Sequence, residues 1–168
     1  YEIAGGERLG EGERIVGNRY RFAVPFSGAA RNAARPFIDA HHAVFDHNRM
    51  ELSDNGELIY RFSLTERTWK TASLMFSGTP GQAWTVTVAA DGRKPVVVDA
   101  TAAQTGEVAR VSLPASVLPA KELTVKMALP KGGSVGGLFF EGDLAGAPLT
   151  AYGFTRWRET KSGSFVSF

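Results

Sequence analysis

All three histidines of the chain lie in one short segment, FIDAHHAVFDHNRMEL, at residues 37 to 52. A zinc or iron site needs imidazoles that converge, with a carboxylate or water completing the shell. His41 and His42 are predicted to point to opposite faces of an extended segment, and His47 follows His42 by five residues, unlike a helical pair. A turn that brings His42 and His47 together beside Asp46 is the remaining metal arrangement. The alternative is that these histidines are solvated or bond to the backbone.

Other patterns of catalytic residues are weak in this sequence. Among 17 acidic residues, only Glu141, in LFFEGDL, adjoins an apolar run of the kind that raises the pKa of a general acid. The sequence has no GxSxG elbow, and the Gly-rich segments GEGERIVG and KGGSVGG lack the features of a phosphate-binding loop. The remaining enzymatic hypothesis is a jelly-roll lyase or hydrolase that uses His42 or His47 with a tyrosine or arginine.

Aromatic side chains outside the apolar phase of their strands indicate a binding surface, because sugar rings stack on flat side chains while their hydroxyls bond to polar neighbours. Trp84 is in phase with the valines of WTVTV and is predicted to be in the core. Trp69 is out of phase with the apolar residues of ASLMF. Near the end of the chain, Tyr152, Arg156 and Trp157 combine aromatic and cationic groups. An exposed tryptophan beside arginine suits a saccharide, including an acidic one. Alternatively, these tryptophans cover sheet edges or a domain contact.

The elements that position these residues are predicted to be strands, because apolar residues recur at every second position between turn-forming segments. The predicted inward residues of the clearest runs are Tyr20, Phe22, Val24 and Phe26; Leu58, Tyr60, Phe62 and Leu64; Trp84, Val86 and Val88; Ala109, Val111 and Leu113; and Leu123, Val125, Met127 and Leu129. Only SGAARNAARPF and PASVLPAK are compatible with helix. The pattern predicts an all-β fold, an antiparallel β-sandwich or jelly roll with short helical turns.

Length and composition favour one domain over residues 1–168, with residues 1–17 as either an edge strand or a linker. The formal net charge is only +2 and the basic residues are scattered, which disfavours nucleic acid and anionic membranes as partners. The absence of cysteine excludes disulfides and thiolate chemistry. No apolar stretch is long enough to predict a membrane span.

The sequence over roughly residues 43 to 145 resembles the galactose-binding-like β-sandwich superfamily, which includes discoidin-type domains and many carbohydrate-binding modules. The likeness lies in FDHNRMELSDNGELIYRFSL, ASLMFSG, AWTVTVAADGRKPVVV, VARVSLPASVL, ELTVKMAL and GGLFFEGDL. It implies a non-catalytic jelly roll that binds glycans with loops at one end and often holds a structural Ca²⁺. The matching oxygen ligands here are Asp46, Asn48 and Glu141.

The leading hypothesis is a non-catalytic carbohydrate-binding or ancillary module of a larger polysaccharide-related protein, extracellular or in a bacterial envelope. Its partners are a poly- or oligosaccharide and neighbouring domains of the parent protein. The predicted ligand-binding residues are Trp69, Trp157, Tyr152, Arg156, His41 and His42. The alternatives are the polysaccharide-active jelly-roll enzyme and a purely structural or adhesive domain.

Overall fold

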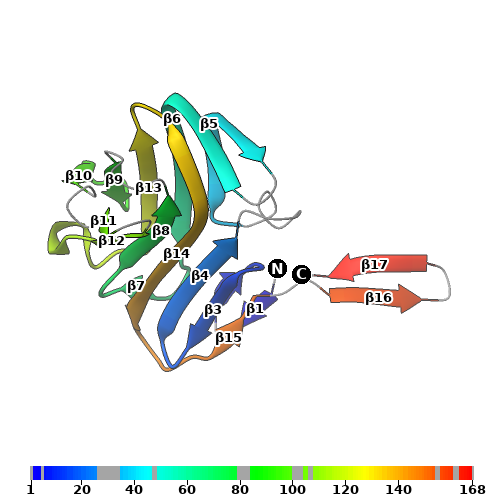
Figure 1. Ribbon diagram of the computed structural model, residues 1–168. Coiled ribbons are helices and arrows are strands. Elements are labelled where there is room, and N and C mark those ends of the chain that lie inside the picture. The colour runs from blue at the N-terminus through cyan, green and yellow to red at the C-terminus, as the bar shows by residue number, and fades with distance from the viewer. Residues whose placement is uncertain are drawn as a thin grey trace.

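The computed structural model describes the chain except residues 1, 5, 26–34, 47–48, 79–83, 100–103, 106–107, 154–155, 161–162 and 168. At residues 2–4, 24–25, 99, 104–105, 156–160 and 163–167 it describes the backbone only. The described residues are mostly in antiparallel strands, so the all-β prediction is confirmed (Figure 1). PASVLPAK contains one 3₁₀ turn, η2 (Ala115–Val117). Most of SGAARNAARPF lies outside the described residues. No helix in the described part is long and apolar enough to cross a membrane.

Thirteen strands form one hydrogen-bonded sheet that folds over into two layers. The first layer has the order β10 (Val96–Asp99), β9 (Thr85–Ala90), β13 (Glu122–Leu129), β6 (Arg49–Ser63), β5 (Phe37–Asp46). The second has the order β11 (Gln104–Thr105), β12 (Val108–Ser112), β8 (Ser73–Gly78), β14 (Gly133–Ala145), β4 (Arg19–Pro25), β3 (Glu13–Val16), β15 (Ala151–Tyr152). The short β7 (Thr68–Trp69) pairs with the end of β14.

Two further pairs of strands are separate from this sheet. β1 (Glu2–Ala4) pairs with β2 (Glu7–Leu9), and β16 (Arg156–Thr160) pairs with β17 (Gly163–Ser167). Figure 1 shows the β16–β17 hairpin apart from the two layers.

The long strands β6 and β14 join the two layers. The first part of β6 pairs with the start of β14 at Met50–Val135, and its second part pairs with β13 over residues 56–63. Between these two parts, Asn55 has a left-handed backbone with φ 60°, and its N–H donates to the carbonyl of Pro130. β6 therefore passes from one layer to the other, and no separate crossover is needed.

Aromatic rings from both layers meet in the core. Phe62 of β6 stacks on Phe140 of β14 with ring centroids 3.8 Å apart, and Tyr60 of β6 lies 6.1 Å from Phe22 of β4. Trp69 packs edge-on against Phe140. The predicted inward residues are buried wherever their side chains are described, which confirms the alternation in all five runs. The side chain of Val24 and residue 26 lie outside the described part.

Residues 7–17 contribute to the sandwich. β3 pairs with β4, and Ile15 is fully buried. Glu13 is 2% exposed and accepts hydrogen bonds from Tyr20 and Arg35. Burial, together with the nearby Glu13 carboxylate, raises the pKa of Tyr20 well above its ordinary value, so its hydroxyl stays a donor. β3 therefore lies between β4 and β15 in the second layer.

The expectation that only Glu141 is desolvated is wrong. Glu7 and Glu13 are the buried carboxylates among the described residues, and Glu141 lies half-buried on the outer face of the second layer. Glu7 accepts hydrogen bonds from the backbone N–H groups of Thr65, Glu66 and Arg67. Both buried acids lie in short strands, ERL and ERIV, in which buried and exposed residues alternate. No long apolar run adjoins them, so their burial was not evident from the sequence.

Two adjacent phenylalanines on β14 test which face of the second layer holds the fold together. Phe140→Ala removes the ring stacked on Phe62, and we expect it to lower the free energy of unfolding by ~3–5 kcal/mol. Phe139→Ala is the matched control, because Phe139 is on the outer face and only partly buried, and we expect a clearly smaller loss. Urea denaturation measures both. Equal losses would contradict the assignment of the two faces.

Candidate functional site

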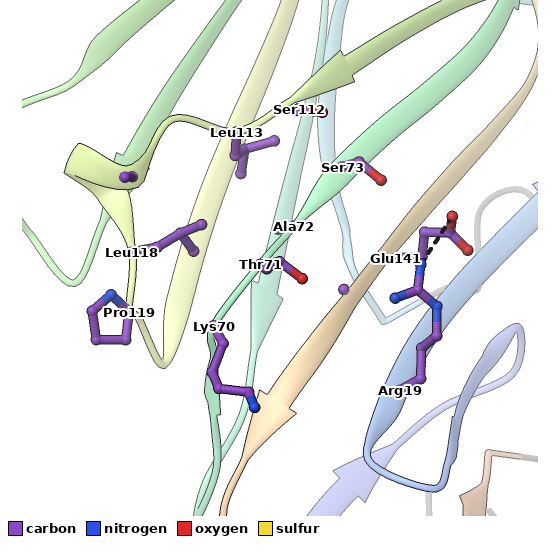
Figure 2. A pocket seen from close by; sticks show the side chains of 12 residues that line it. Arg19, Lys70, Thr71, Ala72, Ser73, Ser112, Leu113, Leu118, Pro119 and Glu141 are labelled. Carbon is purple, nitrogen blue, oxygen red and sulfur yellow. Dashed lines mark ion pairs between the residues drawn. The ribbon is translucent and has the colours of Figure 1, made fainter.

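A cavity of about 600 Å³ opens on the outer face of the second layer (Figure 2). Its polar lining comes from β4, β8, β12, β14 and the segment before β8, and comprises Arg19, Lys70, Thr71, Ser73, Ser112 and Glu141. Its apolar lining comes from η2 and the residues around it, and comprises Leu113, Ala115, Leu118 and Pro119. The cavity thus has one apolar wall and one polar wall that can form hydrogen bonds.

Arg19 organises the acidic part of the polar wall. Its guanidinium lies 3.2 Å from the Glu141 carboxylate and 2.8 Å from the Asp143 carboxylate. The hydrogen bond from Arg19 holds the pKa of Asp143 below its ordinary value, and the same contact raises the pKa of Arg19. The Asp143 contribution to stability is therefore present above the ordinary carboxyl pKa and is lost as the pH falls through the lowered one.

The apolar wall is fixed by contacts to its backbone. Arg93 donates to the carbonyls of Val117 at 3.1 Å and Pro119 at 2.9 Å, which anchors η2. On the other side, the backbone N–H of Trp69 donates to the carbonyl of Ala120 at 2.9 Å. Because both sides are held by backbone acceptors, the wall is in place without a ligand.

Gly142 permits the close crossing that brings Lys70 and Thr71 to the cavity. The Lys70 N–H donates to the Asp143 carbonyl at 2.8 Å, and the Thr71 hydroxyl accepts from the Asp143 N–H at 3.1 Å. A Cβ at position 142 would lie 2.0 Å from the Thr71 carbonyl oxygen, which is a severe overlap with backbone. Glycine is therefore required at this point of β14.

A row of outward-facing residues extends from the cavity across the second layer. Arg21 pairs with both Arg14 and Glu141, and Glu141 pairs in turn with Ser73. The complete row, one residue from each of six neighbouring strands, is Tyr152, Arg14, Arg21, Glu141, Ser73 and Ser112. At ~4.8 Å between strands, the row is about 24 Å long.

Smaller cavities follow this row. One of about 480 Å³ is lined by Arg14, Arg21, Glu141 and Tyr152 among others, and one of about 200 Å³ lies over Phe139. Both share Glu141 with the large cavity. Together they form one depression along the sheet face, called the outer-face groove below.

Trp69 is not exposed, contrary to the prediction. Its side chain is fully buried and packs edge-on against Tyr20 at 5.3 Å. A bend at residues 70–71 separates β7 from β8, so the alternation seen in β8 does not extend back to Trp69. Trp69 supports the groove from beneath and cannot stack on a ligand. Trp84 is 1% exposed, as predicted for a core residue.

Of the other predicted aromatic and cationic residues, Tyr152 lies at one end of the groove and is 54% exposed. Arg156 and Trp157 are in β16, where only the backbone is described, so their place in a ligand site stays a prediction. The structure therefore brings one member of this group to the groove.

His41 and His42 lie in the other layer. His41 and His42 are exposed on β5, and His41 is 3.4 Å from the Asp39 carboxylate. A bulge between His41 and Ala43 interrupts the strand alternation, and His42 has φ 50°. His47 lies outside the described residues. Among the described side chains, no three His, Asp or Glu residues are grouped as metal ligands would be.

Of the oxygen ligands predicted for calcium, Asp46 and Glu141 lie far apart. Asp46 is beside the β5–β6 turn, next to the Met50–Val135 pair, whereas Glu141 is six residues farther along β14, about 20 Å away. These two carboxylates do not fit a single ion, and Glu141 pairs with Arg19 instead. Asn48 lies outside the described residues. Calcium binding itself stays a prediction.

Most residues of the groove were not among those predicted from the sequence to bind a ligand. Arg19 and Arg21 are the outward set of the alternating run RYRFAVPF, and Met75, Arg110 and Glu141 are outward in the same way in their own strands. The alternation therefore predicts which face of its strand each residue occupies. It does not predict the strand order that places these residues side by side.

The fold and the site together define an antiparallel β-sandwich with a polar groove across one sheet face. No family model matches the sequence, and neither does any curated protein.

Among solved structures, the chain is similar to a family GH115 4-O-methyl-α-glucuronidase with specificity for decorated arabinogalactans (16% identity, TM-score 0.41, 62% of this chain and 16% of that one). It is also similar to an exo-β-1,3-galactanase from Phanerochaete chrysosporium (15% identity, TM-score 0.36, 79% of this chain and 29% of that one). A third similar structure is a family 35 carbohydrate-binding module from an environmental isolate (15% identity, TM-score 0.34, 87% of this chain and 96% of that one). The chain spans less than a third of either enzyme. Likenesses of this degree do not identify a family or an activity.

The Arg19 pairs should shape the groove without holding the fold together. Arg19→Met should change the free energy of unfolding by less than about 1 kcal/mol, because both carboxylate partners are partly exposed to water. Arg35→Met is the contrasting variant, since it leaves the buried Glu13 carboxylate without its guanidinium, and it should cost ~3–5 kcal/mol. Urea denaturation measures both. A loss above about 2 kcal/mol for Arg19→Met would show that these pairs are structural.

The crossing at Gly142 is tested by adding one methyl group. Gly142→Ala should lower the free energy of unfolding by ~1–3 kcal/mol or more, because the methyl group overlaps the Thr71 carbonyl. Gly136→Ala, on the same strand, is the control, since its methyl group would meet only the Ser77 hydroxyl at 3.0 Å. Thermal melting followed by circular dichroism measures both. Equal melting temperatures for the two variants would refute the close crossing.

Proposed function

We propose that the chain is a non-catalytic carbohydrate-binding module whose ligand lies in the outer-face groove. The observation that carries the proposal is the row of six side chains in register across the second layer, which ends at a cavity with one apolar and one polar wall. Saccharides need this combination, because a sugar ring has an apolar C–H face and a rim of hydroxyls. A groove about 24 Å long suits a chain of sugars better than a single one.

The two walls of the large cavity have different tasks in this proposal. Leu113, Leu118 and Pro119 contact the C–H face of a sugar ring. Across the cavity, Ser73 and Glu141 exchange hydrogen bonds with its hydroxyls. The Glu141 carboxylate is already oriented by Arg19, so less conformational entropy is lost when a ligand binds. At the other end of the groove, Tyr152 supplies an exposed ring on which a second sugar stacks.

The electrostatics of the groove favour binding over hydrolysis. A glycosidase needs one carboxyl group that stays protonated as a general acid, which requires a raised pKa. Arg19 lowers the pKa of Asp143 and lies between Asp143 and Glu141. Of the two histidines of the lyase hypothesis, His42 is in the other layer and His47 lies outside the described residues. The assignment to a larger extracellular or envelope protein remains part of the proposal.

The test is retention of the purified chain in native gels that contain plant, algal or bacterial polysaccharides, with and without EDTA, with product release assayed in parallel. We expect retention by at least one polysaccharide without release of oligosaccharides. Glu141→Gln should weaken retention by an uncharged polysaccharide roughly tenfold, because a charged hydrogen-bond acceptor is replaced by a neutral one.

The matched control is Glu57→Gln. Glu57 has the same side-chain exposure as Glu141, 32%, and a cationic partner, Lys126, but lies in the first layer. Equal retention of the two variants would place the ligand elsewhere. Released products would favour the enzymatic hypothesis, and a chain that no polysaccharide retains would favour the structural or adhesive one.

A further inference from the structure

We propose that Arg21 and Arg110 form a subsite for an anionic group on the saccharide, a carboxylate or a sulfate. This inference rests on the carbohydrate-binding function proposed above and specifies its class of ligand. The subsite is the cavity of about 200 Å³ within the outer-face groove.

Two cations from different strands line this cavity. Arg21 comes from β4 and Arg110 from β12, with β14 and β8 between them in the sheet. Phe139 and Met75, which are opposite one another on β14 and β8, also line it. So do Ser73 and Glu141, whose carboxylate is paired with Arg19. An anion above Phe139 and Met75 would therefore lie between two guanidinium groups.

The two cations lack the carboxylate partners that other arginines have. Within the described part of the chain, Arg19, Arg49, Arg61 and Arg93 each lie within 4 Å of an acid, and neither Arg21 nor Arg110 does. The acid closest to Arg21 in the sheet register is Glu141, which pairs with Arg19. The Nε of Arg21 is buried and has no hydrogen-bond partner.

The surroundings orient both guanidinium groups before a ligand arrives. Arg21 lies over the ring of Phe139, 5.6 Å from its centroid. An Nη2–H of Arg110 donates to the sulfur of Met75 at 3.3 Å, a weak acceptor that an oxyanion would replace. The planar fork of arginine matches a carboxylate or sulfate better than a sugar hydroxyl. The geometry thus selects charged over neutral sugars.

Arg14 extends the same positive field. It pairs with Arg21 on the neighbouring strand, and no ion pair is found for it among the described residues. It lines the adjoining cavity of about 480 Å³ with Tyr152. A saccharide with repeated anionic groups would therefore meet a second cation farther along the row.

The experiment compares polymers that differ only in charge. Polygalacturonate is paired with its carboxyl-reduced form, and dextran sulfate with dextran, in native gels or titration calorimetry at several salt concentrations. Arg21→Met and Arg110→Met keep much of the side-chain volume and remove the charge. Arg61→Met is the matched control, because Arg61 is a partly exposed strand arginine of the first layer. Thermal melting of each variant verifies that it is folded.

We expect a charged polymer to bind at least tenfold more tightly than its neutral form, and each of Arg21→Met and Arg110→Met to lose roughly tenfold, with no loss for Arg61→Met. Preference for polygalacturonate assigns the subsite to a carboxylate, and preference for dextran sulfate assigns it to a sulfate.

Equal binding of charged and neutral polymers would overturn the subsite and leave the carbohydrate-binding function standing. Loss that is equal in all three variants would also overturn it, because it would indicate a general charge effect. Binding of none of these four polymers would overturn the subsite, and it would overturn both proposals if the wider polysaccharide panel also showed no retention.

Discussion

The stacking of Phe62 on Phe140 is the contact on which the rest of the structure depends. It joins β6 of one layer to β14 of the other at the centre of the core. Because strand side chains alternate, burying Phe140 directs its neighbours Phe139 and Glu141 to the outer face. The same interaction that closes the sandwich thus sets which residues of β14 reach the groove. A shift of one residue in register would exchange the core and the groove.

The outer face of the second layer differs from the outer face of the first in how its charges are arranged. In the first layer, Arg61 and Lys126 each face an acid on a neighbouring strand, so positive and negative charges alternate. In the second layer, Arg19 forms ion pairs with both Glu141 and Asp143. Arg21 and Arg110 therefore have no carboxylate partner among the described residues. The resulting positive field is local to the groove, which explains how a chain with a net charge of only +2 presents a cationic surface. Charge scattered in sequence becomes concentrated in space.

Period-two alternation was sufficient to predict the strands, the core residues and the sandwich, because each strand has one buried face. It failed at Trp69, where a bend resets the phase, and at His42, where a bulge does. It could not reveal that residues as distant in sequence as Arg14, Arg21 and Glu141 lie in one row, since their alignment depends on long-range strand pairing. Nor could it show that Glu13 is a buried partner of Arg35 and not a solvated acid. Local pattern determines the face of a strand, and topology determines the site.

The resemblance to galactose-binding-like domains implied glycan binding by loops at one end of the sandwich, whereas the groove lies on a sheet face. The measurement that separates these two sites most directly is a ¹H–¹⁵N correlation spectrum recorded during titration with a fragment of the most strongly retained polysaccharide. If the groove is the binding site, the shifted amides will include those of Arg21, Ser73 and Glu141, with little change along β5. Shifts confined to β5 and the β5–β6 turn, or no shifts at saturating fragment, would contradict binding in the groove.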